Sequence, residues 1–176
     1  MLQHRGPRLE AQPALLLGNS PKASGFVRSS SHTVTVASPQ LPSMETEAPP
    51  QFDGPGGKWS PETLLCASVA DCFVLTFRAI ARAAKLEWSH LECRVEGVME
   101  RRERLLQFTR YTTFATLTVP TGTDAVKARE FLERAEHSCL IANSLHGTRA
   151  LDAQVIMSSE SPHRTSLEGG EGAARA

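Results

Sequence analysis

The stretch Ser60–Phe77, which reads S-P-E-T-L-L-C-A-S-V-A-D-C-F-V-L-T-F, decides the fold more than any other part of this sequence. Ser60 is a good helix N-cap, Pro61 suits the first helical position, and Glu62 lies at the positive end of the helix dipole. From Thr63 to Phe77 there is almost no polar face, so we expect a long helix that is buried on nearly all sides. Because a small single domain rarely encloses a helix completely, the pattern predicts that a second subunit covers part of it.

The segments around this helix predict an α+β domain. Before the helix we expect short strands at 14–17, 25–28 and 32–36, followed by a long proline-rich loop at 37–60. After the helix we expect two strands, at 91–101 and 105–119, joined by a hairpin turn at 101–104. A helix at 123–136 and a strand at 150–157 complete the expected elements. The order of strands, long helix, hairpin, short helix and strand is typical of α+β folds rather than of alternating β-α-β units. We interpret 1–13 as a loose leader, 14–157 as the folded domain and 158–176 as a disordered tail.

Composition and charge narrow the classes of function. The chain has 176 residues, is 40% hydrophobic and carries nineteen basic and nineteen acidic side chains, so its formal charge is zero. This balance argues against a nucleic-acid partner or a basic membrane-binding surface. The apolar run Leu64–Phe77 is short for a bilayer span and includes Asp71, so no membrane partner is expected. No export signal is recognisable, which predicts a cytoplasmic protein whose four cysteines are thiols.

The cysteines are the candidate reactive groups. Cys72 lies in the middle of the apolar helix, where the simple interpretation is a small core residue. Cys139 follows the second predicted helix, and Cys66 and Cys93 are expected in the core. Cys139 with two nearby histidines fits no common zinc spacing, and no dinucleotide-binding glycine motif occurs, so we expect neither a metal nor a cofactor.

Three pieces of sequence together resemble a known family. They are W-S-P-E-T-L-L from Trp59, A-D-C-F at 70–73, whose Cys72 follows Glu62 by ten residues, and E-H-S-C-L-I-A-N-S-L at 136–145. Their combination is similar to the OsmC/Ohr family of osmotically inducible and organic-hydroperoxide-resistance proteins. The resemblance implies an OsmC-like fold, in which antiparallel sheets wrap around long central helices in an intertwined homodimer with active sites at the interface.

The resemblance also implies a chemistry and assigns residues to it. Family members are thiol-dependent peroxidases, so Cys72 would attack the peroxide O–O bond, an alcohol would leave, and Cys139 would condense with the sulfenic acid to form a disulfide. Glu62 matches the family's glutamate that helps to position the reactive centre. The implied partners are an organic hydroperoxide as substrate and a lipoyl, thioredoxin or low-molecular thiol as reductant.

Other functions stay open beside this one. The family's arginine on an N-terminal strand is not found at 18–22, so Lys22 or Arg28 would have to supply the positive charge that favours a thiolate at Cys72. Without that cation, an OsmC-like binding or structural protein, or a redox sensor, is the alternative. Ten residues of ideal helix turn Glu62 roughly 80° from the face of Cys72 and separate them by about 15 Å. Glu62 is therefore either a partner of the helix dipole or acts through a cation or across a subunit boundary.

Overall fold

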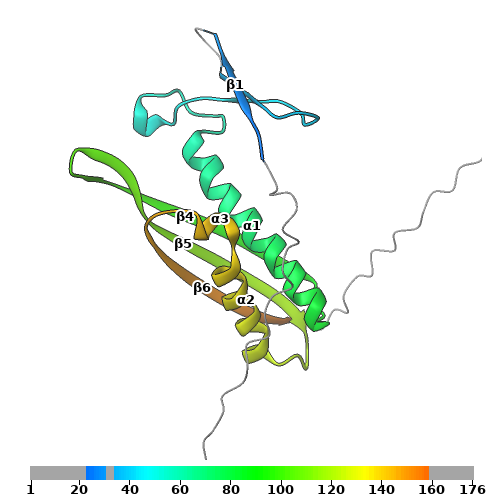
Figure 1. Cartoon of the computed structure of the whole chain (residues 1–176). Helices are drawn as coiled ribbons and strands as arrows, with labels where there is room; N and C mark the ends of the chain where they lie inside the picture. The colour runs from blue at the N-terminus through cyan, green and yellow to red at the C-terminus, as the bar shows by residue number, and fades with distance from the viewer. Residues whose placement is uncertain (1–22, 31–33, 159–176) are drawn as a thin grey trace, which may run out of the picture. The chain divides into compact units, whose positions relative to one another are not determined.

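The computed structural model describes residues 23–30 and 34–158, and the chain divides into two compact units between Lys58 and Trp59. Figure 1 shows the elements of both units along the chain. The expected strand at 14–17, Lys22, the leader and almost all of the expected tail lie outside the described residues.

The first unit contains a small antiparallel sheet. Its strands are β1 (Phe26–Ser29), β2 (Val34–Ala37) and β3 (Met44–Thr46), and they pair in the order β1-β2-β3. The first two confirm the expected strands, but the prediction of an uninterrupted loop at 37–60 was wrong. β3 and a short 3-10 turn, η1 (Pro50–Phe52), lie within that segment, because Met44–Thr46 pairs with the edge of β2 between two proline-containing stretches.

The second unit begins with the predicted long helix, α1 (Pro61–Ala84). Ser60 caps it with a reciprocal pair of bonds: the Ser60 hydroxyl accepts from the Thr63 amide at 3.2 Å, and the Ser60 amide donates to the Thr63 hydroxyl at 2.8 Å. The helix ends at Lys85, which has a left-handed backbone (φ 54°) and donates to the carbonyls of the last turn. The local signals in the sequence therefore set both ends of the helix.

A long hairpin follows α1. β4 (His90–Arg102) and β5 (Leu105–Pro120) pair antiparallel from the His90/Thr118 pair to the Arg102/Leu105 pair, with one irregularity between Val98 and Met99. Only Glu103 and Arg104 join them, both with positive φ (48° and 74°), as a two-residue hairpin turn requires. The turn is thus tighter than the expected 101–104, and the strands are correspondingly longer.

The chain then returns to the sheet through two helices. α2 (Ala125–Ser138) is capped by the Asp124 carboxylate, and the short α3 (Leu140–Asn143) follows it directly. β6 (Thr148–Ser158) completes the sheet in the order β4-β5-β6. The α+β class is confirmed, but one pairing differs from the expected antiparallel sheets, because β6 runs parallel to β5. A parallel neighbour needs a crossover connection, and α2 supplies it.

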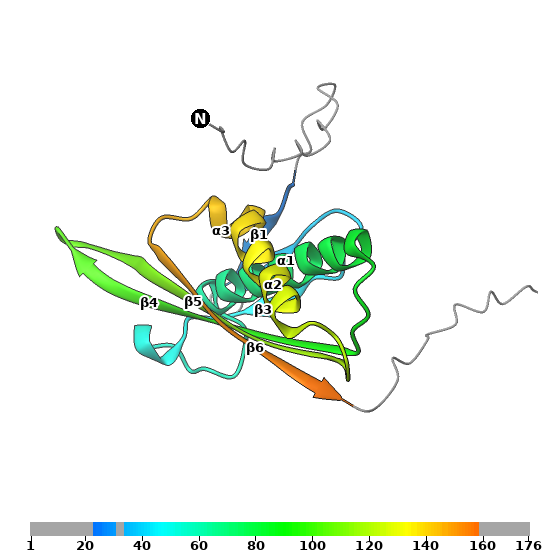
Figure 2. The ribbon, with the colours of Figure 1, turned by 90° about the horizontal axis from the view of Figure 1, so that it is seen from below.

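The core of the second unit lies between its sheet and its helices, which Figure 2 shows from below. Alternate residues of β5 are buried in one cluster with residues of α1 and α2, while the opposite face of that strand is more exposed. The main cluster consists of Phe73, Phe77 and Ala81 from α1, Ala115, Leu117 and Val119 from β5, Ala128, Phe131, Leu132 and Ala135 from α2, and Ala153 from β6. Trp88 packs edge-on against Phe77, with ring centroids 5.4 Å apart.

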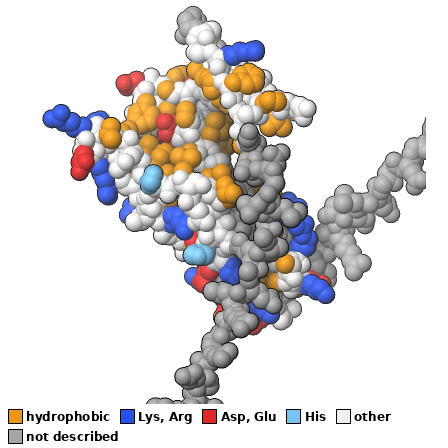
Figure 3. All heavy atoms as spheres, viewed as in Figure 1, with side chains coloured by type: hydrophobic (Ala, Val, Ile, Leu, Met, Phe, Trp, Pro, Cys, Tyr) orange, Lys and Arg blue, Asp and Glu red, His pale blue; other side chains and the backbone are white. Residues whose placement is uncertain are grey.

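α1 buries one stripe rather than its whole circumference. Its fully buried residues, Val69, Phe73, Phe77 and Ala81, recur every four positions, whereas Leu75 on another side is 51% exposed. The expectation of burial on nearly all sides is therefore not met within one chain, because a sheet and one helix cover only one side of α1. Figure 3 shows, in orange, the hydrophobic side chains that are visible on one face of the described residues. By length and composition, α1 is also the one helix of the described residues that could cross a membrane.

Candidate functional site

Cys72 occupies the middle of α1, where it is half-buried beside the stripe that faces the core. Its neighbour Asp71 projects in another direction. Asp71 is exposed and lines a shallow depression of about 390 Å³ together with Ala70, Val74 and the first residues of β4. Because consecutive helical side chains are about 100° apart, this carboxylate does not share the face of the Cys72 thiol.

Cys139 lies at the junction of two helices. It ends α2 and begins α3, with extended backbone torsions (φ −64°, ψ 111°) that turn the chain sharply. Its amide donates to the Glu136 carbonyl at 3.3 Å, and its carbonyl accepts from the Asn143 amide at 2.9 Å. The side chain is 1% exposed, and its thiol donates to the Val69 carbonyl of α1 at 3.9 Å.

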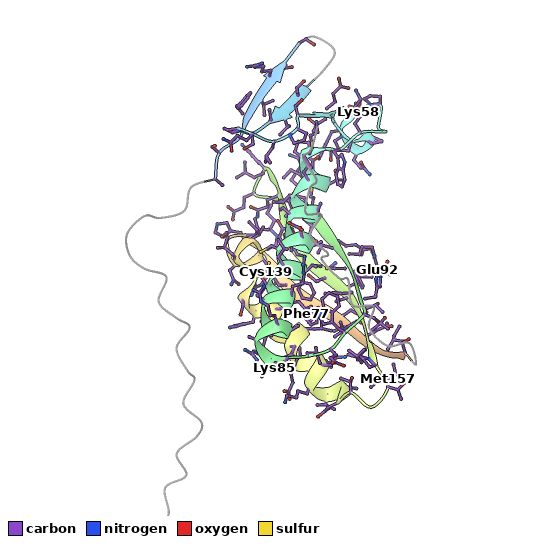
Figure 4. All side chains as sticks on the ribbon, turned by 90° about the vertical axis from the view of Figure 1, so that its right-hand side faces the viewer. Lys58, Phe77, Lys85, Glu92, Cys139 and Met157 are labelled. Atoms are coloured by element: carbon purple, nitrogen blue, oxygen red, sulfur yellow. The ribbon has the colours of Figure 1, made fainter. Side chains whose placement is uncertain are left out.

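The two cysteines that the sequence singled out come together in space. Cys139 forms a small buried cluster with Val69 and Ala142, and Cys72 packs against that cluster. Figure 4 shows Cys139 where the α2–α3 segment passes alongside α1. Burial raises the pKa of the Cys139 thiol, and its interaction with the Cys72 thiol raises it further. A pair of thiols 67 positions apart in the sequence therefore meets in one apolar cluster, and a reversible disulfide would require such proximity.

Glu62 is the third residue named from the sequence, and it lies in the first turn of α1. Its Oε2 atom is buried and has no hydrogen-bond partner among the described residues. A buried carboxylate oxygen is costly without a donor. Arg28, one of the two cations considered above, lies in the first unit with its guanidinium 5.3 Å from the Phe26 ring centroid. The other, Lys22, falls outside the described residues.

The two remaining cysteines are Cys66 on α1 and Cys93 on β4. Cys66 packs where β4 has a glycine, since a Cβ on Gly97 would come within 3.0 Å of its sulfur. Burial raises the pKa of the Cys93 thiol to about 11, with a smaller contribution from Cys139. Cys93 was expected only as a core residue, and its place near Cys139 depends on how the sheet packs against the helices, which one sequence does not reveal. Within 23–30 and 34–158, no group of three or more potential ligands could hold a metal ion.

The raised pKa of Cys93 predicts slow alkylation of its thiol in the folded protein. At pH 8, a thiol with a pKa of about 11 is ionised in about one molecule per thousand, about a hundredfold less than one with the ordinary value of 9.0. We expect iodoacetamide to modify Cys93 at least about a hundredfold more slowly in the folded protein than in urea, with the rate rising towards pH 11. Peptide mass spectrometry against pH measures this, and a folded-state midpoint near pH 9 would contradict it.

Comparison with known protein families identifies one family over more than half of the chain. The model of the family described as OsmC-like protein matches residues 54–152. An uncharacterized protein of Bacillus subtilis, YmaD, is 24% identical over 109 residues, which are 60% of this chain and 73% of that protein.

Solved structures share the fold. An OsmC-like protein of unknown function from Vibrio cholerae superimposes with a TM-score of 0.69 at 16% identity, over 76% of this chain and 99% of that one. A Legionella pneumophila structure described as an organic hydroperoxide resistance protein OsmC gives a TM-score of 0.62 at 19% identity, over 78% and 99% of the two chains.

Proposed function

The chain belongs to the OsmC-like protein family, and we propose that it is a thiol-dependent peroxidase that reduces organic hydroperoxides to alcohols. The observation that carries this proposal is the shared apolar cluster of Cys72 and Cys139. A similar fold in a Legionella protein named for organic hydroperoxide resistance supports the substrate class. Apolar side chains around the two thiols favour the organic part of such a substrate over water.

The proposed cycle uses the two thiols in turn. The Cys72 thiolate attacks one peroxide oxygen, the O–O bond breaks, and the alkoxide leaves and takes up a proton as the alcohol. Cys72 is thereby oxidised to a sulfenic acid. The Cys139 sulfur then attacks the Cys72 sulfur, forming the disulfide and releasing water. An external lipoyl, thioredoxin or low-molecular thiol restores both thiols by exchange, and a cytoplasmic location would keep such reductants available.

The roles divide by exposure. Cys72 is half-buried and is the thiol that a substrate can reach, whereas Cys139 is closed off behind it. We assign the peroxidatic role to Cys72 and the resolving role to Cys139 on this ground. Glu62 would act as a positioning residue, because its buried carboxylate oxygen needs a hydrogen-bond donor. A cationic donor held there would in turn favour the Cys72 thiolate. Consumption of cumene hydroperoxide with a dithiol reductant tests the function directly.

A second candidate follows from that carboxylate. Because Glu62 Oε2 has no hydrogen-bond partner among the described residues, the cation that would activate Cys72 is not identified there. A chain that lacks such a cation would be a binding or structural member of the family, or a redox sensor whose thiols react without rapid turnover. Slow oxidation of Cys72 by stoichiometric peroxide, with no catalytic consumption, would favour this candidate.

We also propose that the active form is a homodimer. The face of α1 that carries Leu75 is apolar and open in the single chain, and burying apolar area is worth roughly 25 cal/mol per Å². We expect sedimentation at low micromolar concentration to give twice the chain mass. Leu75→Lys would shift this equilibrium towards the monomer, while Val126→Lys, at an exposed position of α2, would not. A well-folded monomer of the unmodified protein would refute the dimer.

A further inference from the structure

The turn that carries Cys139 is tied to the sheet by one arginine of β6. The Arg149 Nε lies 3.3 Å from the Glu136 carboxylate, and its Nη1 donates to the Asn143 side-chain oxygen at 2.5 Å. The Asn143 amide nitrogen in turn donates to the His137 carbonyl at 3.0 Å. A single guanidinium therefore connects the last turn of α2 with the end of α3.

These contacts bracket Cys139 on both sides. Glu136 precedes it by three residues and Asn143 follows it by four, so the ends of the turn are held by the same side chain. The Arg149 and Glu136 side chains are 27% and 19% exposed, whereas both side chains of every other ion pair among the described residues are more exposed than these. Shielding of this kind makes an ion pair stronger and less sensitive to salt than a pair at the surface.

Arg149 itself is part of the sheet. Arg149 lies in the parallel ladder of β5 and β6, opposite the buried Tyr111. Cys139 also contacts α1, through the bond of its thiol to the Val69 carbonyl. The turn that carries the resolving cysteine thus has contacts both to a strand of the sheet, through Arg149, and to the helix that carries Cys72.

We propose that Arg149 is a positioning residue for the resolving step, an inference that rests on the proposed function. Forming the disulfide requires the two sulfurs to approach to about 2.05 Å with a narrow range of torsion angles. If the turn loosens, Cys139 spends less time in that geometry, and the sulfenic acid on Cys72 persists. A second hydroperoxide then oxidises it to the sulfinic acid and leaves as a second alcohol, which ends the cycle.

The chain offers a matched control in Arg129. It also links α2 to β6, with Nε 3.2 Å from the Glu133 carboxylate and Nη1 donating to the Ala153 carbonyl at 2.7 Å. It lies ten residues before Cys139, however, and makes no contact with the turn that carries it. Arg129→Ala therefore removes a link between α2 and β6 without changing the contacts of the turn that carries Cys139.

The test measures how oxidised Cys72 divides between two products. Wild type, Arg149→Ala and Arg129→Ala are treated with excess cumene hydroperoxide, and mass spectrometry compares the Cys72–Cys139 disulfide with the Cys72 sulfinic acid. We expect disulfide formation to slow about tenfold in Arg149→Ala, with a matching gain of sulfinic acid, and to be unchanged in Arg129→Ala. The first oxidation of Cys72 should proceed at the same rate in all three, and Arg149→Lys should recover part of the loss.

Equal partition in wild type and Arg149→Ala would overturn the inference. If Arg149→Ala does not fold, Glu136→Ala removes one contact and leaves the arginine in place; a smaller shift towards sulfinic acid is then expected, and no shift overturns the proposal. Diamide separates this inference from the proposed function, because it joins two thiols without a peroxide. If peroxide does not oxidise Cys72, the proposed function is refuted. The positioning role is refuted separately if diamide forms the disulfide at the same rate in Arg149→Ala as in wild type.

Discussion

Replacing Cys72 with serine is expected to lower the rate of organic hydroperoxide consumption by at least about a thousandfold. A serine hydroxyl has nearly the same size but does not ionise near neutral pH, and it cannot form a sulfenic acid. Cumene hydroperoxide loss in the presence of a dithiol measures the effect. Cys139→Ser should differ from it, because one peroxide per chain is still reduced before Cys72 accumulates as sulfenic or sulfinic acid.

Cys93→Ser is the matched control for this prediction. Cys93 is also half-buried, and its pKa of about 11 makes it a poor nucleophile at neutral pH. Its replacement should leave the peroxidase rate within about twofold of wild type, because the thiolate attack does not use it. Activity that survives in Cys72→Ser, or that disappears equally in Cys93→Ser, would contradict the assignment of the peroxidatic thiol.

The largest effect on stability is expected from Phe77→Ala. Phe77 is fully buried between α1 and the sheet, packs against Trp88 and is labelled in Figure 4. Removing its ring leaves a cavity in the main core, which costs roughly 3–5 kcal/mol in the free energy of unfolding. Urea denaturation measures this, with all variants compared at one protein concentration because a dimer's stability depends on it.

Val126→Ala serves as the control for Phe77→Ala. Val126 is a hydrophobic residue of a helix in the same unit, but it is 71% exposed and lies in the first turn of α2. Its replacement should change the free energy of unfolding by less than about 0.5 kcal/mol. Similar losses in the two variants would mean that the cluster around Phe77 is not the core of the folded protein.

The sequence predicted those elements that depend only on residues close together in the chain. Ser60 and Pro61 placed the start of α1, and the residues typical of strands in 105–119 predicted β5. The reading of Cys72 and Cys139 as a pair rested on the family resemblance, and the structure places both in one cluster. Their roles in chemistry remain a prediction.

Other features depend on contacts that one sequence does not encode locally. β3 has three residues and forms a strand because β2 offers it an edge, so its sequence alone resembles the surrounding loop. The parallel direction of β6 follows from the crossover through α2, not from its own residues. Arg149 looks like any charged residue of a strand, and its role emerges only when β6 is placed beside the turn that carries Cys139.

The central claim is that Cys72 and Cys139 form one redox pair, and peptide mapping after a single equivalent of organic hydroperoxide tests it most directly. The reduced protein is treated with cumene hydroperoxide, free thiols are blocked by alkylation at low pH, and the digest is analysed without reduction. The account predicts one disulfide, between Cys72 and Cys139, with Cys66 and Cys93 recovered as alkylated thiols. Bridges to Cys66 or Cys93 in comparable yield, or an unoxidised Cys72, would contradict it.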